Sequence, residues 1–351
     1  MREEIQMIKN DVAVIGIGLG GTKVGYEFQK RNYKTYLVNG SEQDNRTISG
    51  AKDILVLERY NGMAGDRSLA YDALTNNKMI LKKIREIEQK IILVAATGGG
   101  TTGSGTIPYI AELCSSLPGK IVCVALMMPR ADEAVQKRMN AYNAAKEIME
   151  LDKLGATIFI NNESDSNLEK INYNFVNMMD AFFKDDSASS TSNFDDAEKI
   201  KILSDHGAFV IAMRTSKPDS AIGTQDMVES LTAKNIFLPI NNDGIVSHIG
   251  IINQKGVDID EHEIIRAVGN PENLFKGNNG TSTIVCASGL GFPVEYISGL
   301  GKKAVAEQRE RMQKKKAFAI LDDLEEVPEE QPVIQKKKRH RGISFDELEN
   351  L

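Results

Sequence analysis

The stretch Ile91 to Pro108, IILVAATGGGTTGSGTIP, decides the fold. Its apolar, partly β-branched start predicts a buried strand, and five glycines interspersed with small hydroxyl residues then predict a loop before a helix starting near Pro108. Glycines let backbone N–H groups approach an anion, and the positive end of the helix dipole points to the same place. The stretch therefore predicts a phosphate-binding loop. It is not a Walker A loop, because that motif's spacing and lysine are absent, and a flexible Gly/Ser linker would not follow a core strand directly.

Two further glycine turns follow predicted strands. The first, Gly16 to Thr22, lies between a strand at Asp11 to Gly16 and a helix from about Lys23 to Arg31, and it fits the G-x-G-x-x-G pattern of dinucleotide-binding proteins. In that interpretation Glu42, after the next strand, is the acid that contacts a ribose. The other turn, at 61–67, follows a strand at 54–57. One dinucleotide needs one such loop, whereas a nucleoside triphosphate laid across the sheet edge can use several, so we favour a polyphosphate ligand in a crevice at the carboxyl ends of the strands.

Polar residues follow two more predicted strands. The strand at 120–126 leads to Glu133, and the helix after it carries Lys137 and Arg138, which either bind the ligand or form a solvated charged face. The strand at 157–160 ends at Asn162, whose amide suits recognition of a base or ribose.

Composition limits the class of protein. With 351 residues and 41% hydrophobic residues, the chain suggests two domains plus appendages. No apolar stretch reaches the roughly 18 residues that span a bilayer, and the acidic start does not resemble a signal peptide, so we expect a cytoplasmic protein without membrane contacts. The net charge of −6 argues against nucleic-acid binding by the folded body. The three cysteines lack metal-ligand spacing and are expected to be reduced core thiols: Cys114, Cys123 and Cys286.

The segment Gly99 to Gly105, GGTTGSG, resembles the GGGTGTG signature of the tubulin/FtsZ superfamily, with Thr101 and Ser104 as substitutions. The resemblance implies an α/β, tubulin/FtsZ-like fold with GTP/GDP and Mg²⁺ as cofactors. Its parts would be a Rossmann-like GTP-binding domain (1–170), a long central helix (171–190), a catalytic loop with a second α/β domain (191–292), a long C-terminal helix (293–326) and a disordered charged tail (327–351).

The resemblance also implies which residues contact the nucleotide. Glu133 and Lys137 resemble the ribose contacts of the superfamily, Tyr173 the aromatic residue that stacks on guanine, and Asn177 the asparagine that reads its edge. The sequence departs from FtsZ at Ser41, where an aspartate is expected. The other implied contacts are Gly18, Gly20, Gly21, Thr22, Asn39, Ala64, Gly65, Gly99, Gly100, Thr101, Thr102, Gly103, Ser104, Gly105 and Asn162.

A second informative stretch is 192–198, SNFDDAE. From the residues alone it is a helix start in which Asn193 or Asp195 caps free amides. It also resembles the N-x-D-x-x-D/E loop that enters the nucleotide site of the next subunit in tubulin and FtsZ filaments, which implies catalytic roles for Asn193, Asp195 and Glu198. A long helix at about 171–184 would carry this loop to the opposite end of the molecule. Each subunit would then hold half a catalytic site at each end and assemble head to tail into filaments.

The region 205–292 is expected to alternate strands with a helix at 226–233, and its histidines show no ligand spacing. The expected strands are 208–213, 235–240, 246–252 and 283–287.

Beyond this region, the sequence of residues 295–326 predicts a long helix with a narrow apolar stripe at heptad spacing, formed by Val305, Met312 and Ala319. This stripe packs either on its own domain or along a neighbouring subunit. The tail carries a basic cluster at 336–341 between acidic residues, which either binds DNA phosphates or an acidic protein surface, or only keeps the tail solvated.

The C-terminal features resemble the TubZ family of plasmid or phage partitioning GTPases more than FtsZ. That resemblance implies a DNA-binding adaptor of the TubR type, bound to centromere DNA and engaged through the tail. The alternatives are an FtsZ-type cell-division GTPase and a Rossmann-type dehydrogenase; the latter lacks a convincing catalytic histidine or Tyr-Lys arrangement.

Overall fold

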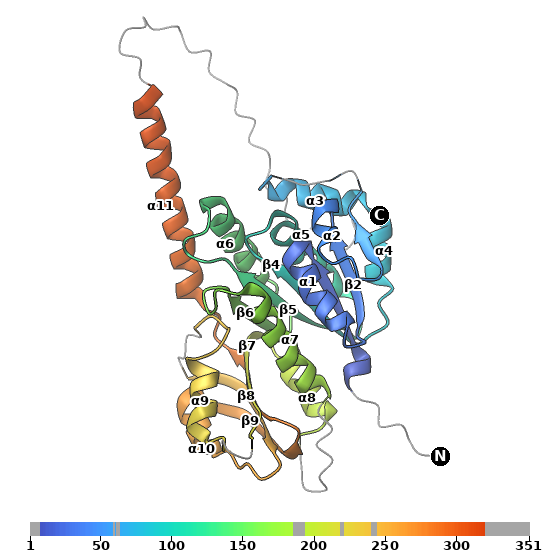
Figure 1. The fold of residues 1–351 in the computed structure, drawn as a ribbon, viewed down its shortest axis with the longest axis vertical. Coiled ribbons are helices and arrows are strands. Elements are labelled where there is room, and N and C mark those ends of the chain that lie inside the picture. Colours follow the sequence, from blue (N-terminus) through green and yellow to red (C-terminus); the bar gives the residue numbers. More distant parts are fainter. Residues whose placement is uncertain are drawn as a thin grey trace, which may run out of the picture.

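A computed structural model of the chain describes residues 8–58, 60, 64–184, 194–217, 221–239 and 244–319. Its strands form one ten-stranded sheet in the order β3-β2-β1-β4-β5-β6-β7-β10-β8-β9. Figure 1 shows the ribbon of the described residues. The first six strands in this order are parallel to one another, and they span Val12–Ile17 (β1), Lys34–Asn39 (β2), Ile54–Val56 (β3), Ile91–Thr97 (β4), Ile121–Met128 (β5) and Ala156–Asn161 (β6).

Helices cover both faces of the parallel region, and its strands are accordingly apolar and buried at nearly every position. Along β1, Val12 and Val14 join one core cluster, whereas Ala13 and Ile15 join the other. Helices α1, α7 and α8 contribute to the first cluster and α3, α4, α5, α6 and α11 to the second. The helices of the first half are η1 (Ile8–Asp11), α1 (Gly18–Gln29), α2 (Glu42–Arg46), α3 (Arg67–Asn76), α4 (Lys78–Arg85), α5 (Thr101–Ser116) and α6 (Val135–Met149).

Helix α5 begins at Thr101, seven residues before the predicted start, and Pro108 lies inside it. Most of the expected glycine loop is therefore the first turn of a helix. Gly100 is extended at the N-cap position, and Gly103 and Gly105 are buried against neighbouring elements. These residues still provide the close backbone approach for which the sequence indicated a loop.

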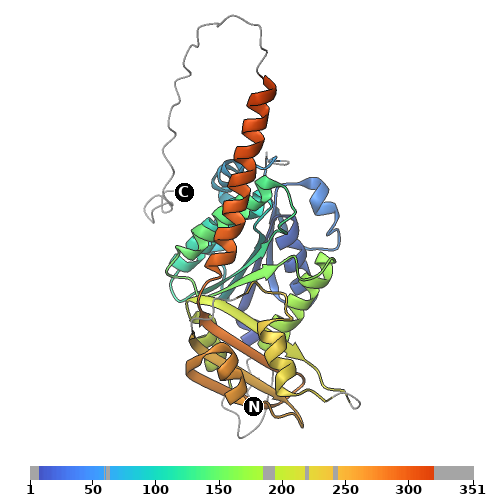
Figure 2. The same ribbon diagram turned by 90° about the vertical axis from the view of Figure 1, so that its left-hand side faces the viewer.

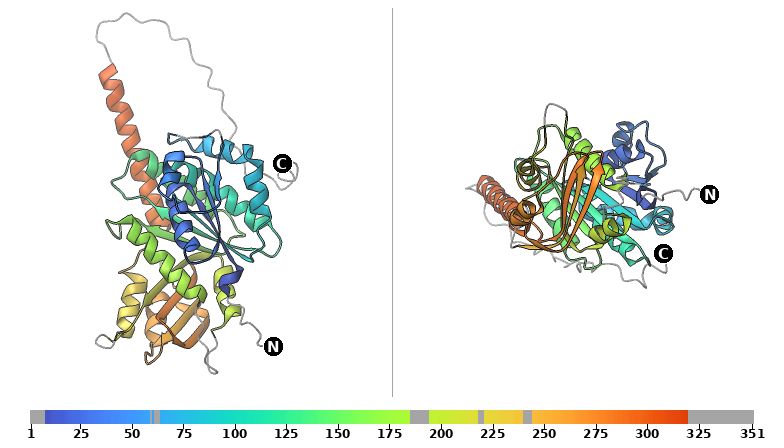
Figure 3. Two further views of the ribbon diagram at one scale, coloured as in Figure 1. Left: turned by 45° about the vertical axis from the view of Figure 1, so that its right-hand side comes forward. Right: turned by 90° about the horizontal axis from the view of Figure 1, so that it is seen from below.

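Helix α7 (Leu168–Lys184) runs between the parallel region and the second half of the chain, and α8 (Asp196–Ser204) lies at its far end (Figures 1 and 3). The second half comprises β7 (Gly207–Arg214), α9 (Thr224–Thr232), β8 (Ile245–Gln254), α10 (Glu261–Val268), β9 (Asn270–Gly280) and β10 (Thr283–Leu290). β10 pairs antiparallel with β7 and β8, while β9 lies parallel to β8 at the sheet edge.

Two expectations for this half differ from the structure. The strand expected at 235–240 is reduced to an isolated bridge between Phe237 and Ile160, with residue 240 outside the described part. Strand β9 was not expected, because its sequence NPENLFKGNNG is rich in residues that disfavour strands. An edge strand tolerates Pro271, because only one side of it must pair.

The C-terminal helix α11 (Val294–Ala319) packs on its own domain through its first half and projects beyond the body in its second (Figure 2). Ile297, Leu300 and Ala304 are buried, whereas Val305 is half-buried and Met312 is 57% exposed. The docked face is thus not the heptad stripe expected from the sequence. The charged tail lies outside the described residues, as does the side chain of Ala319.

None of the helices in the described ranges has both the length and the apolar character needed to cross a membrane.

Candidate functional site

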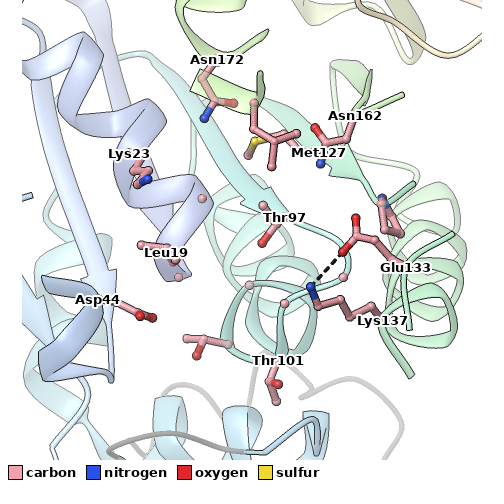
Figure 4. Close-up of a pocket in the computed structure, with 18 of the residues that line it drawn as sticks. Leu19, Lys23, Asp44, Thr97, Thr101, Met127, Glu133, Lys137, Asn162 and Asn172 are labelled. Carbon is pink, nitrogen blue, oxygen red and sulfur yellow. Dashed lines mark hydrogen bonds and ion pairs between the residues drawn. The ribbon is translucent and has the colours of Figure 1, made fainter. Parts of the chain in front are cut away.

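A cavity of about 440 Å³ opens where β1, β4, β5 and β6 end and where α1, α5 and α7 begin (Figure 4). Among the predicted contacts, the cavity is lined by Gly18, Gly20, Gly99, Gly100, Thr101, Thr102, Gly103, Glu133, Lys137 and Asn162. Residues from four separate predicted motifs therefore meet in one site, as expected for strand ends on the same edge of a parallel sheet.

One end of the cavity is formed by the first turns of α1 and α5. The N-terminal amides of a helix lack intrahelical acceptors and carry the positive end of its dipole, so two helix starts facing one space favour a polyanion. Gly18 has a φ of +67°, and a Cβ there would lie 3.2 Å from the backbone nitrogen of Gly103. The two turns thus approach each other more closely than a larger residue would allow.

The wall of the cavity along α6 carries an ion pair. The Lys137 ammonium donates to Glu133 Oε2 at 2.9 Å, and Glu133 Oε1 accepts from the backbone N–H of Arg130 at 3.0 Å (Figure 4). The neighbouring Arg138 turns away from the cavity and is 4% exposed. Its guanidinium donates to the Glu133 carbonyl at 3.0 Å and forms a two-pronged ion pair with Glu307 of α11. Of the two basic residues considered together in the sequence, only Lys137 faces the site.

Asn172 of α7 lies beside Met127 at the opposite end of the cavity from Thr101 (Figure 4). Leu168 of the same helix also lines the cavity. Leu168 and Asn172 are four residues apart and therefore share one helix face. An apolar surface beside an amide suits a purine base, since the first can stack on the ring and the second can hydrogen-bond to its edge.

Tyr173 and Asn177, the predicted base contacts, do not line the cavity. They lie on the adjacent stripe of α7, which faces the C-terminal end of α1. There the Arg31 guanidinium lies 5.3 Å from the centre of the Tyr173 ring and donates to Asn177 Oδ1 at 2.5 Å. Helix α7 therefore borders the cavity through Leu168 and Asn172 and not through Tyr173 and Asn177, because a helix turns by 100° per residue and neighbouring positions face different partners.

Other predicted contacts support the site without lining it. Gly21 packs so closely on β4 that a Cβ would lie 2.2 Å from the Ala95 carbonyl oxygen. The Thr22 hydroxyl donates to the Leu19 carbonyl at 3.0 Å, and the Asn39 amide donates to Asn45 Oδ1 at 3.0 Å. Ser104 and Gly105 are buried within the first turns of α5, and Gly65, which follows Ala64, donates its backbone N–H to the Thr101 hydroxyl at 3.0 Å.

Several lining residues were missed by the sequence reasoning. Lys23 of α1 and Glu169 of α7 both line the cavity and form an ion pair at 3.3 Å. Ser41, which replaces an expected aspartate, caps α2 by accepting from the Asp44 N–H at 3.2 Å, and the Asp44 side chain points into the cavity (Figure 4). The N-cap spacing Ser41-x-x-Asp44 was the available signal that a carboxylate three residues later lies on the same turn.

The predicted catalytic loop lies elsewhere. Asp195 caps α8, accepting from the N–H groups of Ala197 at 2.8 Å and Glu198 at 3.2 Å, and Glu198 Oε2 accepts from the Asp195 N–H at 2.7 Å. Burial raises the pKa of Glu198, and the negative charge of Asp195 adds to that shift. Neither carboxylate lines the cavity, because the 17 residues of α7, about 25 Å of helix, separate the cavity from α8. Asn193 lies outside the described residues.

Comparisons with known proteins agree with this geometry. Residues 11–169 match the family described as Tubulin/FtsZ family, GTPase domain. The chain is 25% identical to the tubulin-like protein TubZ of Clostridium botulinum C phage over 97% of this chain and 96% of that protein.

Solved structures resemble the whole described fold. The crystal structure of Clostridium botulinum phage c-st TubZ aligns with a TM-score of 0.75 and 23% identity, covering 86% of this chain and 99% of that one. A protofilament of Bacillus thuringiensis serovar israelensis TubZ, described as a GTPyS form, aligns with a TM-score of 0.72 and 17% identity, covering 90% and 96%.

Proposed function

Residues 11–169 of this chain are a GTPase domain of the tubulin/FtsZ family, and we propose that the chain binds GTP in the cavity and hydrolyses it when a second copy docks head to tail. The observation that carries the proposal is the separation of two half-sites. The cavity offers a nucleotide cradle, whereas the oriented carboxylates of Asp195 and Glu198 lie at the far end of α7. A heterologous contact that joins such ends does not close on itself and therefore builds a filament.

In this proposal the triphosphate lies against the first turns of α1 and α5, and Glu133 and Lys137 contact the ribose. Leu168 stacks on the base, and Asn172 hydrogen-bonds to its edge. Mg²⁺ favours oxygen ligands and is held mainly by phosphates, with one or two side-chain oxygens. Asp44 and the hydroxyl of Thr101 are the cavity residues suited to hold it. When bound, Mg²⁺ neutralises charge that develops on the phosphates.

The other half-site supplies Asn193, Asp195 and Glu198. The reciprocal hydrogen bonds at the start of α8 fix the direction of both carboxylates, which is what orienting an attacking water requires. Phosphoryl transfer depends mainly on positioning and charge stabilisation, so these oriented carboxylates, together with the backbone amides and Mg²⁺ of the cavity, are sufficient for it. Self-association is supported by the protofilament described for the Bacillus TubZ.

The experiment is complementation between two inactive variants. Asp195→Ala keeps the cavity but loses the catalytic carboxylate. Gly103→Val keeps α8 but displaces the start of α5 from β4, because a Cβ at this position would lie only 2.9 Å from the Thr97 carbonyl oxygen. Mixed together, they place one intact cavity against one intact α8, and GTP hydrolysis should recover in part. A matched control is Asp260→Ala, which removes an equivalent cap from α10 and should leave hydrolysis unchanged. No recovery in the mixture, with both variants folded, would mean that the site is not shared.

We further propose that the filament segregates plasmid or phage DNA through a TubR-type adaptor on centromere DNA, engaged by the charged tail. Similarity to a phage TubZ over 97% of the chain supports this role over that of an FtsZ-type cell-division GTPase. Deletion of residues 336–351 should abolish association with the adaptor–DNA complex and spare polymerisation. Unchanged adaptor binding by the deleted protein would refute the tail assignment.

A further inference from the structure

Helix α5, which begins at the phosphate end of the cavity, contains a proline at an interior position. Pro108 has no N–H, so it cannot donate to the carbonyl of Ser104 four residues earlier, and its ring crowds that carbonyl. Ser104 is fully buried. A buried carbonyl oxygen without a donor costs about 1–3 kcal/mol, so a partner from outside the helix is needed.

Arg67, the first residue of α3, provides that partner. Its guanidinium donates twice to the Ser104 carbonyl oxygen, from Nη2 at 2.5 Å and from Nε at 3.2 Å. Its other edge meets Glu147 of α6, with Nη1 to Oε1 at 3.0 Å and Nη2 to Oε2 at 2.7 Å. The planar fork is thus anchored by a carboxylate on one side and holds the α5 backbone on the other, a geometry that a lysine cannot reproduce.

The turn before Arg67 is tied to the same region. Ala64 and Gly65 have φ values of 45° and 93°, and the Gly65 N–H donates to the hydroxyl of Thr101, which lines the cavity. Gly105 allows the close approach, since a Cβ there would lie 2.7 Å from both the Arg67 carbonyl oxygen and the Ala70 side chain. Arg67 therefore lies where α3 meets the first two turns of α5.

We propose that Arg67 is a positioning residue for phosphate binding: it replaces the hydrogen bond that Pro108 cannot make and so fixes the α5 start against the cavity. This inference rests on the proposed nucleotide site. Arg67 itself is not among the described residues that line the cavity, so its effect reaches the phosphates through the α5 backbone.

The test restores the missing donor. In Arg67→Met the start of α5 must be ordered when GDP binds, so the affinity for GDP should fall by up to about tenfold if the cost is of the order of one lost hydrogen bond to a charged group. In the double variant Arg67→Met with Pro108→Ala, the backbone N–H gained at position 108 can donate to the Ser104 carbonyl, and most of the affinity should return. Pro108→Ala alone should bind GDP much as the intact protein does. Guanosine, which lacks phosphate, serves as the second probe, and Arg67→Met should leave its affinity unchanged.

Hydrogen exchange of residues 98–107 in the nucleotide-free protein gives a readout independent of binding. Exchange should rise in Arg67→Met and return in the double variant. If Arg67→Met loses affinity for GDP and for guanosine equally, Arg67 does not act through Ser104 and the inference is overturned. The same holds if adding Pro108→Ala to Arg67→Met restores neither the affinity for GDP nor the protection from hydrogen exchange. If Arg67→Met does not fold, Glu147→Gln, which removes only the anchor charge, should show the same pattern more weakly, and an unchanged GDP affinity there overturns it. If the intact protein binds no GDP, the proposed function fails, and the exchange comparison alone supports or overturns the contact.

Discussion

Two glycines on α11 should respond in opposite directions to the same substitution. At Gly299 an added Cβ meets no atom within 4 Å, whereas at Gly301 it would lie 2.6–2.9 Å from three ring atoms of Tyr142 on α6. Both positions are in the same helix, two residues apart, so their helix propensities and distances from the helix ends are closely matched. Gly299→Ala and Gly301→Ala therefore isolate the effect of packing α11 on α6.

The magnitude follows from two competing terms. Replacing glycine by alanine inside a helix stabilises by about 0.8–1 kcal/mol, and this gain applies to both variants. At Gly301 the new carbon lies about 1 Å inside normal carbon contact distance, and such overpacking costs about 1–3 kcal/mol. Because the Tyr142 atoms include Cγ near the root of the side chain, the ring cannot simply swing its tip away. We therefore expect Gly301→Ala to be less stable than Gly299→Ala by about 1–3 kcal/mol.

Urea unfolding of the two variants and the intact chain measures this difference, and hydrogen exchange of residues 294–310 locates it. Gly299→Ala should unfold at a slightly higher urea concentration than the intact chain. Gly301→Ala should unfold at a lower one, with faster exchange in the first half of α11. Equal midpoints for the two variants would refute the docking of this face of α11 on α6.

Three further outcomes follow from the same geometry. Asn172→Ala should weaken GTP binding and reduce the preference for GTP over ATP. Asn177→Ala should leave GTP binding unchanged but lower the free energy of unfolding by about 1 kcal/mol, because the Asn177 amide oxygen accepts a hydrogen bond from Arg31. Equilibrium titrations with GTP and ATP measure both affinities, and equal losses of affinity in the two variants would contradict the proposed position of the base. The Arg138 guanidinium holds the pKa of Glu307 below its usual 4.5, so the stability from this ion pair is present above that pH and lost as the pH falls below it. Hydrogen exchange of α11 should therefore rise on acidification in the intact chain and rise less in Glu307→Gln. Identical pH profiles of exchange for the two proteins would contradict this role of the ion pair. Burial raises the pKa of each free cysteine thiol to about 12; these are Cys114, Cys123 and Cys286. Iodoacetamide at pH 8 should therefore label none of them in the native protein and all of them after unfolding. Labelling of the native protein would contradict this prediction.

Much of the site was predictable because its main signal is local in the sequence. A strand followed by a glycine-rich turn and a helix places backbone amides at a strand end, and parallel strands bring such ends together. This reasoning located Gly18, Gly100 and Gly103 correctly at the cavity. It did not locate the start of α5, because the glycine-rich sequence that favours a loop also fits a tightly packed helical turn.

The residues of α7 that line the cavity were less predictable, because they depend on the rotation of this helix about its own axis. Asn172, Tyr173 and Asn177 all carry suitable side chains, and the sequence does not reveal which stripe of α7 faces the cavity. Packing against α1 orients these residues, since Arg31 donates to Asn177 and lies 5.3 Å from the centre of the Tyr173 ring, which remains 52% exposed. Tertiary contacts likewise stabilise β9, whose composition argues against a strand.

Helix α6 shows most clearly that the surroundings of the cavity include contacts that sequence patterns do not encode. Its Asn140 donates to the Gly65 carbonyl at 3.3 Å, Glu147 anchors Arg67, and Arg138 binds both Glu307 and the Glu133 carbonyl. One helix therefore contacts the turn before α3, the wall of the cavity at Glu133 and the C-terminal helix. Because these side chains act through distant partners, their spacing along α6 resembles an ordinary solvated face. The wall of the cavity and α11 therefore share contacts with the same helix.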